Sequence, residues 1–186
     1  EDVVEALYRA SQAGVEITLL VRGICCLRPG VPGVSERIEV RAIVDRYLEH
    51  GRVFQFENAG KTEVYISSAD WMPRNFHRRV ELLVPIEDAR IRSTLVDLLA
   101  LSVADTAKSW LLRSDGSYHR VVVPKERVEL RSQSRLIELA RGKLKVAEQA
   151  ARPASRFLMA ATAERSPLEG KLPKLARRRR RRNDRD

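Results

Sequence analysis

Apolar residues first recur at helical spacing and then form a short continuous run. Residues 2–13 predict an amphipathic helix, and Gly14 is placed to end it. The residues on the apolar face of this helix are Val3, Val4, Leu7 and Ala10. Residues 15–22 are mostly apolar, which predicts a buried strand centred on residues 17–21. A helix, a glycine and a buried strand in this order are typical of an α/β layered fold.

The rest of the pattern continues the alternation of strands and helices. The expected strands cover residues 52–56, 63–67 and 79–84, and residues 110–113 are expected to pair with residues 118–123 as a hairpin. The expected helices cover residues 42–49, a long segment capped by Asp88, and residues 132–141. The inner side of the long helix is expected to carry Ile91, Leu95, Leu98, Leu99 and Ser102. Residues 22–33 and 71–76 are expected to be loops, and the first of them leaves the end of a strand where ligands bind in open α/β sheets.

Positive charge is concentrated at the C-terminal end of the chain. The formal net charge is +10, and residues 171–186 contain nine basic and two acidic residues. Residues 142–186 are rich in Ala, Lys and Arg with weak patterning, so we expect a basic tail that is weakly structured or disordered. Such a tail binds polyanions loosely through counterion release, but it does not identify a partner by itself.

The first residues and the cysteines indicate the context of the chain. The chain begins with an acidic, amphipathic segment that is unlike a signal peptide, and it does not begin with Met. We therefore expect it to be part of a longer protein that continues upstream. Cys25 and Cys26 are adjacent, and neighbouring cysteines rarely bridge each other, so we expect reduced thiols in a cytosolic protein. No stretch of about 18 apolar residues occurs, so no membrane-spanning helix is expected.

An arginine follows the first predicted strand directly. Arg22 leaves this strand on a glycine-containing loop, and Arg28 follows on the same loop. A guanidinium group offers a planar fork of donors that suits phosphate oxygens. We expect Arg22 to bind phosphate, whereas Arg28 is equally explained as a solvated loop charge.

Two later stretches carry a spaced set of polar residues that suits phosphoryl chemistry. The set consists of His50, Arg52, Glu57, the pair Ser67-Ser68, and Asp70. Its spacing resembles the signature of the phospholipase D superfamily, which is His-x-Lys, four residues and Asp, followed by Gly-Ser-x-Asn. In this chain Arg52, Glu57, Ser67 and Asp70 replace the Lys, Asp, Gly and Asn of that signature.

Strand alternation gives the first part of this set physical support. His50 and Arg52 share one parity, so both can face the same pocket. In such a site a histidine attacks phosphorus or moves a proton, and a cation holds the non-bridging oxygens. The alternative for His50 is a histidine at the end of the predicted helix 42–49, close to its last carbonyl groups.

Longer strings of residues resemble one family. They are residues 7–15 (LYRASQAGV), 21–30 (VRGICCLRPG), 47–52 (YLEHGR), 56–58 (FEN) and 66–75 (ISSADWMPRN). They closely resemble the polyphosphate kinase family, from residue 1 to about residue 125 and less clearly to residue 141. The resemblance implies that residues 1–141 form the second of two phospholipase D-like catalytic lobes, an α/β layered fold with a mixed sheet flanked by helices. Residues 142–186 would then be the basic tail.

The resemblance also implies an activity and roles for single residues. The activity is the reversible transfer of the terminal phosphate of ATP to inorganic polyphosphate, through a phosphohistidine that lies upstream, so this chain alone would be inactive. His50 is expected to assist as an acid, a base or a phosphate contact and not to be the phosphohistidine. Arg22 is expected to bind nucleotide phosphate, and Arg52 and Ser68 are further candidates for phosphate binding. Mg²⁺ is the implied cofactor, with its ligands outside this chain.

The expected partners are ATP, ADP, polyphosphate, the upstream domains of the same enzyme and further copies of the enzyme in a homo-oligomer. The expected location is the cytoplasm, in line with the reduced thiols, with the arginine-rich tail able to contact polyanions or the inner membrane surface. Two other functions stay open. A phospholipase D-like phosphodiesterase or nuclease fits the skeleton, although its usual Lys and Asn are replaced. A non-catalytic polyanion-binding module fits the tail.

Overall fold

Two β-sheets form the centre of the computed structural model, which describes residues 1–124 and 126–142. The first sheet has the order β1-β2-β6-β7, with β1 parallel to β2 and the other neighbours antiparallel. Its strands are β1 (Ile17–Leu20), β2 (Ile38–Ile43), β6 (Ser109–Leu112) and β7 (Tyr118–Arg120). The second sheet is antiparallel with the order β3-β4-β5. Its strands are β3 (Val53–Phe56), β4 (Glu63–Ser67) and β5 (Leu83–Pro85), and the short 3₁₀ turn η1 (Asn58–Gly60) joins β3 to β4.

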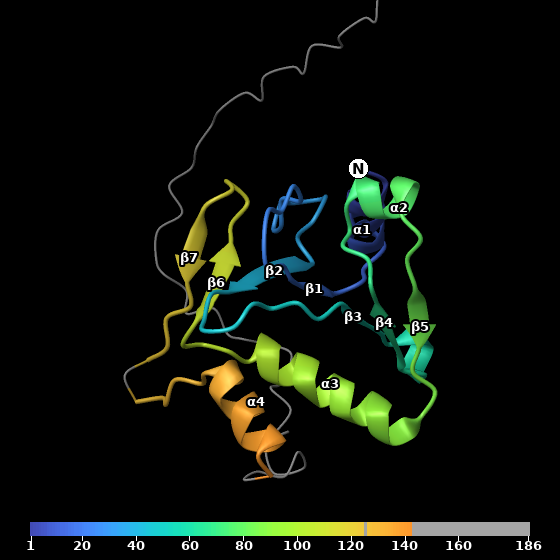
Figure 1. Cartoon of the computed structure of the whole chain (residues 1–186). Helices are drawn as coiled ribbons and strands as arrows, with labels where there is room; N and C mark the ends of the chain where they lie inside the picture. Colours follow the sequence, from blue (N-terminus) through green and yellow to red (C-terminus); the bar gives the residue numbers. More distant parts are fainter. Residues whose placement is uncertain (125, 143–186) are drawn as a thin grey trace, which may run out of the picture. The chain divides into compact units, whose positions relative to one another are not determined.

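Helices lie on both sides of these sheets (Figure 1). Helix α1 (Asp2–Gln12) packs on the first sheet through Val4, Leu7 and Tyr8. Helix α3 (Ala89–Val103) lies on the opposite side, where it contacts β1, β3 and β4, and α4 (Ser132–Ala140) packs beside it. Sheets covered by helices confirm the expected α/β class, but the structure has one mixed and one antiparallel sheet where a single mixed sheet was expected.

The centre of the first core is strand β2. Val40 is fully buried, and it clusters with Leu27, Ile38 and Leu112 under the apolar face of α1. Both edges of β2 are paired, because the strand lies between β1 and β6, and its side chains are buried or half-buried on both faces. The β-branched Ile38, Val40 and Ile43 suit such a pleated and buried position.

The link from β1 to β2 contains no helix. Parallel strands need a crossover of a dozen or more residues, and here residues 21–37 provide it as an irregular loop. Leu27 holds this loop in the core, where its side chain is 3% exposed. The Ser35 hydroxyl donates to the carbonyl of Arg28 at 2.6 Å and accepts from the Val31 amide at 3.1 Å. Leu27 therefore anchors the loop that carries Arg22 near its middle, and the hydrogen bonds of Ser35 anchor it near its end.

Several predicted elements are confirmed. Asp88 caps α3 by accepting hydrogen bonds from the amides of Arg90 at 2.8 Å and Ile91 at 3.0 Å. The hairpin is formed by β6 and β7, and the last helix is α4. The inner side of α3 is shifted from the predicted one, because Leu101 is buried while Ile91 is 54% exposed.

Other predicted elements are wrong. No helix forms over residues 42–49, since strand β2 continues to Ile43 and residues 44–52 are irregular. The apolar spacing there is compatible with a helix, but pairing with β1 and β6 decides the conformation. The expected loop at residues 71–76 contains α2 (Pro73–Arg78), which begins at a proline, as the first turn of a helix allows. The strand expected at residues 79–84 is the shorter β5. The predicted tail covers residues 142–186, and all of it except Gly142 lies outside the described residues.

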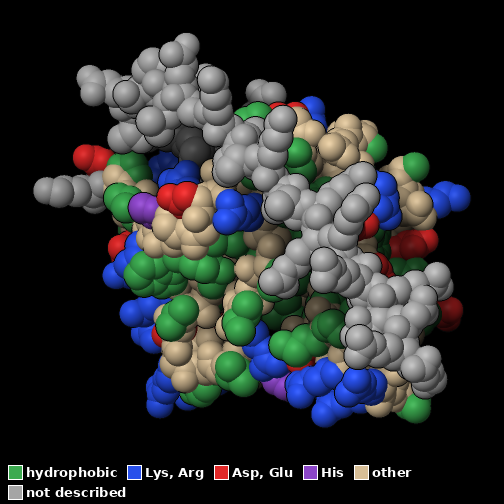
Figure 2. All heavy atoms as spheres, turned by 90° about the horizontal axis from the view of Figure 1, so that it is seen from above, with side chains coloured by type: hydrophobic (Ala, Val, Ile, Leu, Met, Phe, Trp, Pro, Cys, Tyr) green, Lys and Arg blue, Asp and Glu red, His purple; other side chains and the backbone are tan. Residues whose placement is uncertain are grey.

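Exposed apolar side chains are frequent in the described part of the chain. Around β5 they include Val80, Leu82 and Leu83. On the face that Figure 2 shows, hydrophobic side chains are interspersed with polar side chains and with Lys and Arg. Among the described helices, none combines the length and the apolar character that crossing a bilayer requires.

Candidate phosphate-binding site

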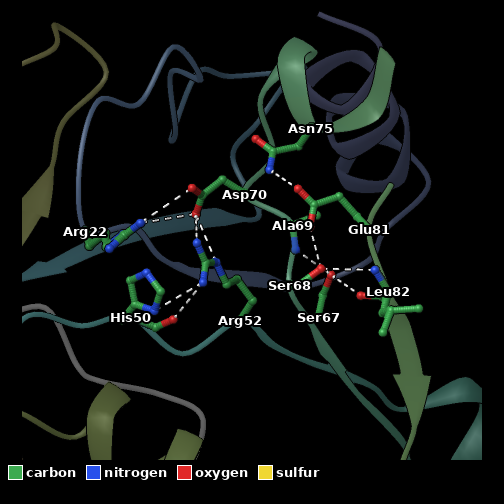
Figure 3. Close-up of polar contacts among 10 residues, drawn as sticks. All are labelled: Arg22, His50, Arg52, Ser67, Ser68, Ala69, Asp70, Asn75, Glu81 and Leu82. Atoms are coloured by element: carbon green, nitrogen blue, oxygen red, sulfur yellow. Dashed lines mark hydrogen bonds and ion pairs between the residues drawn. The ribbon is translucent and has the colours of Figure 1, made fainter. Parts of the chain in front are cut away.

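The first element of the site is the end of β1. The Val21 amide still donates to the carbonyl of Arg41 at 2.8 Å, and the backbone leaves the sheet at the next residue. Arg22 therefore stands directly at the C-terminal end of a strand. Its Nη2 lies 3.3 Å from Oδ1 and 3.5 Å from Oδ2 of Asp70. Two segments that are distant in sequence meet through this contact (Figure 3).

The second element is the start of β3. The Ser67 amide donates to the carbonyl of Arg52 at 2.9 Å, which extends the β3–β4 pairing and places Arg52 opposite Ser67. Arg52 Nε donates to Asp70 Oδ1 at 3.0 Å. Phe54 lies two residues further along the same face of β3, and its ring stacks on Trp71 with centroids 5.3 Å apart and an interplanar angle of 9°. The Arg52–Asp70 contact is therefore supported by the stacking of Phe54, two residues after Arg52, on Trp71, the residue after Asp70.

Asp70 holds both arginines through one carboxylate. Burial by itself would raise the pKa of Asp70, but the hydrogen bond and charge of Arg52 and the charge of Arg22 outweigh it, so the pKa is lower than usual. The carboxylate is therefore ionised at neutral pH. One acidic and two basic groups leave the cluster with a net positive charge, which favours a bound anion.

His50 lies beside Arg52, as the shared strand parity predicts. Its Nδ1 is 3.2 Å from Arg52 Nη1, and the same Nη1 donates to the His50 carbonyl at 3.3 Å. A guanidinium group has only donors, so Nδ1 must accept, and the neutral ring then carries its proton on Nε2. No helix precedes His50, so the alternative of a helix-end histidine is wrong.

A second polar cluster lies next to the first (Figure 3). The Ser68 hydroxyl donates to Glu81 and accepts from the Leu82 amide at 3.0 Å. The Asn75 amide donates to the other oxygen of Glu81 at 2.5 Å. These two donors, Ser68 first, lower the pKa of Glu81 although burial opposes the shift. The Ser68 hydroxyl, a candidate for phosphate binding, is thus engaged with the segment before β5, and no hydrogen bond joins it to Arg22, His50 or Arg52 within the described chain.

The structure brings together three of the four predicted site residues. Arg22, His50 and Arg52 converge around Asp70, whereas the fourth, Ser68, bonds Glu81 and Leu82. Glu57 of the spaced set lies at the other end of β3 and bonds Gln55 and Thr62. Sequence reasoning placed Asp70 in the motif but did not give it a role in the site.

Glu81 and Asn75 were missed as well. Asn75 closes the string 66–75 and Asp70 stands in its middle, so both could have been found from that string. Glu81 carries no local signal, because its partners come from two other segments.

The donor arrangement suits phosphate oxygens more than a metal ion. The Arg22 side chain is 30% exposed and the Arg52 side chain 19%, so both retain N–H groups that a ligand can reach. Across residues 1–124 and 126–142, no three His, Cys, Asp or Glu side chains are grouped so that they could hold a metal ion. Asp70 is already paired with two cations. These residues do not fit a Mg²⁺ site.

Comparison with known proteins gives a consistent result. The model of the family described as "Polyphosphate kinase C-terminal domain 2" matches residues 1–133. A polyphosphate kinase of Rhodopirellula baltica is 55% identical over 135 residues, which cover 73% of this chain and 16% of that protein. A polyphosphate kinase of Thermosynechococcus vestitus is 55% identical over 118 residues, which cover 63% of this chain and 16% of that protein.

A solved structure agrees with these sequence relatives. The crystal structure of a polyphosphate kinase from Porphyromonas gingivalis superposes with a TM-score of 0.72 at 42% identity, and the match covers 77% of this chain and 22% of that one. The chain thus spans about a fifth or less of the length of the relatives it matches.

Proposed function

Because this chain belongs to the polyphosphate kinase family, as its C-terminal domain 2, we propose that it supplies part of the phosphate-binding site of such an enzyme. The reaction is the reversible transfer of the terminal phosphate of ATP to inorganic polyphosphate. In this proposal the phosphohistidine that carries the phosphoryl group lies in a part of the enzyme outside this chain.

The arginine pair held by Asp70 is the observation that carries the proposal. Phosphoryl transfer requires that charge on the non-bridging oxygens be neutralised and that the phosphate be held in line with its acceptor. Two guanidinium groups that share one carboxylate oxygen are oriented before a ligand arrives. A phosphate group can therefore bind without the cost of gathering two mobile arginines.

His50 adds a hydrogen-bond donor for the same ligand. With Nδ1 accepting from Arg52, the Nε2–H is the group of this ring that can donate a hydrogen bond to a phosphate oxygen. In this state His50 stabilises charge on the oxygen that leaves phosphorus, while Arg22 and Arg52 hold the neighbouring oxygens. To act as an acid, the ring must first take up a second proton on Nδ1, which replaces the hydrogen bond from Arg52. Ser68 acts indirectly, since its hydroxyl orders the segment that carries Glu81.

We also propose wider features of the enzyme, which the same family membership supports. Residues 1–141 act as the second of two phospholipase D-like lobes, and residues 142–186 form a basic tail that can contact polyanions or an inner membrane surface. Mg²⁺ is bound by residues outside this chain and by the phosphates. The enzyme works in the cytoplasm as a homo-oligomer, and its upstream domains complete the site.

Substitutions can test whether Arg22 itself binds phosphate or whether any change in its loop weakens the enzyme. In the whole enzyme Arg22→Ala should weaken ATP binding and slow turnover, since a hydrogen bond to a charged group contributes about 1.5–3 kcal/mol, or roughly 10- to 150-fold. Arg22→Lys should recover only part, because an ammonium group lacks the planar fork. Arg28→Ala on the same loop serves as the control and should leave both constants near wild type.

Two results would contradict the proposal. Equal kinetics for wild type and both Arg22 variants would make Arg22 a structural residue. Hydrolysis of a phosphodiester substrate by the whole enzyme, with no polyphosphate formed from ATP, would favour the phosphodiesterase instead.

A further inference from the structure

The segment that delivers His50 to the site has no regular structure of its own. Residues 44–52 connect β2 to β3, two strands of different sheets. The Val44 amide donates to the carbonyl of Lys108 at 3.1 Å, and the Arg46 amide bonds to the Asp45 side chain at 2.8 Å. Something else must therefore fix the course of the chain from Tyr47 to His50.

Gln133 at the start of α4 provides these bonds. Its Oε1 accepts from the Tyr47 amide at 2.9 Å, and its Nε2 donates to the Tyr47 carbonyl at 2.8 Å. The same Nε2 donates to Glu49 Oε1 at 2.7 Å. The side-chain amide of Gln133 thus pairs with Tyr47 as a neighbouring strand would, and its side chain is 5% exposed.

The neighbouring residues of α4 hold the same segment and the helix itself. Arg131 forms a paired contact with Asp45, with Nε 2.8 Å from Oδ2 and Nη2 2.5 Å from Oδ1. Behind them, the amide and hydroxyl of Ser132 donate to the fully buried Asp105 at 2.7 and 2.8 Å. The start of α4 is therefore fixed to the connection between α3 and β6, and it extends two side chains toward residues 45–49.

We propose that Gln133, assisted by Arg131, is a positioning residue that sets the place of His50 against Arg52 in the phosphate site. The inference rests on the proposed role of His50 in phosphoryl transfer. Gln133 touches neither His50 nor the arginine pair, so it acts through Tyr47 and Glu49. Displacement of a reacting group by about 1 Å can cost 100-fold in rate, so contacts at Tyr47 and Glu49, three residues and one residue before His50, are able to control turnover.

The test uses the 186-residue chain labelled with ¹⁵N-histidine. The chain contains three histidines, so their ring signals can be assigned with His77→Gln and His119→Gln variants. Gln133→Met keeps the length of the side chain and removes all three hydrogen bonds. Arg131→Gln removes the Asp45 contact separately, and Glu138→Gln on the same helix, which contacts Arg135, is the matched control.

We expect Gln133→Met and Arg131→Gln to move or broaden the His50 signals while those of His77 and His119 stay in place. Glu138→Gln should change none of them. In the whole enzyme, Gln133→Met should lower kcat by about 10- to 100-fold and change the KM for ATP by less than about 3-fold. Unchanged His50 signals in both variants would overturn the inference, and if Gln133→Met does not fold, Arg131→Gln decides it alone.

A failure of this inference can be distinguished from a failure of the proposed function. If tripolyphosphate fails to shift the His50 signals of the wild-type chain and of the whole enzyme, the role of His50 in phosphate binding fails. The response of the His50 signals to Gln133→Met in the absence of ligand still decides whether Gln133 positions it.

Discussion

Replacing Asp70 by asparagine tests whether one carboxylate holds the arginine pair. Asparagine keeps the shape of the side chain and removes its charge. In the wild type, Asp70 Oδ1 lies 3.0 Å from Arg52 Nε and 3.3 Å from Arg22 Nη2. After the substitution the two guanidinium groups face each other without a shared anion.

The expected loss follows from geometry and exposure. The Asp70 side chain is 20% exposed, so its ion pairs are partly screened by water. A well-placed hydrogen bond to a charged group contributes about 1.5–3 kcal/mol and an exposed ion pair about 0–1 kcal/mol. Of the two contacts, only the one with Arg52, at 3.0 Å, has the distance of a good hydrogen bond, since Arg22 lies 3.3 Å away. The repulsion left between the two arginines adds a small further cost. We therefore expect the Asp70→Asn chain to lose about 1–3 kcal/mol of unfolding free energy at pH 7.

The assay is urea unfolding of the 186-residue chain at several pH values. The pKa of Asp70 is lower in the folded chain than in the unfolded chain, so its contribution is fully present above the unfolded value of about 3.9. That contribution disappears as pH falls through the lower, folded pKa. The difference between wild type and Asp70→Asn should be constant from pH 6 to 8 and shrink below about pH 4.

The prediction has a matched control, and two results would contradict it. Asp97→Asn on α3 also removes a carboxylate, and Asp97 has no hydrogen bond or ion pair in the described part of the chain, so the variant should unfold like the wild type. Equal stability of Asp70→Asn and wild type at pH 7 would refute the reasoning. A difference that persists unchanged to pH 2 would assign the loss to something other than the charge.

Three further predictions concern the active enzyme and the core. His50→Ala in the whole enzyme should reduce polyphosphate synthesis by about 10²- to 10⁴-fold, and ³²P label from ATP found on the peptide containing His50 would instead make it the nucleophile. The 186-residue chain alone should fold, which the dispersion of its backbone amide NMR signals would show, and it should form no polyphosphate from ATP. Any synthesis by this chain would contradict the proposed upstream phosphohistidine. Val40→Ala should lower the unfolding free energy by about 1–3 kcal/mol because Val40 is fully buried, and a loss below about 0.5 kcal/mol would mean that the core closes around the cavity.

Local sequence was sufficient wherever a feature depends on neighbours along the chain. The cap at Asp88 and the β6–β7 hairpin were predictable because their contacts join residues a few positions apart. The apolar face of α1 was predictable because its spacing shows within the helix, although the residues it packs against are distant in sequence. Arg22 and His50 were predicted as site residues for a similar reason. Each lies in a long and unusual string, and Arg22 directly follows a strand that the apolar pattern reveals.

Tertiary structure alone decided the features that join distant segments. The chain after Ala42 has apolar residues at helical spacing, yet β2 extends to Ile43 because β1 and β6 pair on both its sides. Asp70 became the partner of two arginines only when the ends of β1 and β4 met. The role of Gln133 depends on a contact with Tyr47 across 86 positions, and no pattern within either segment encodes it. Hydrogen bonds between segments depend on how the sheets and helices pack, so only the folded chain specifies them.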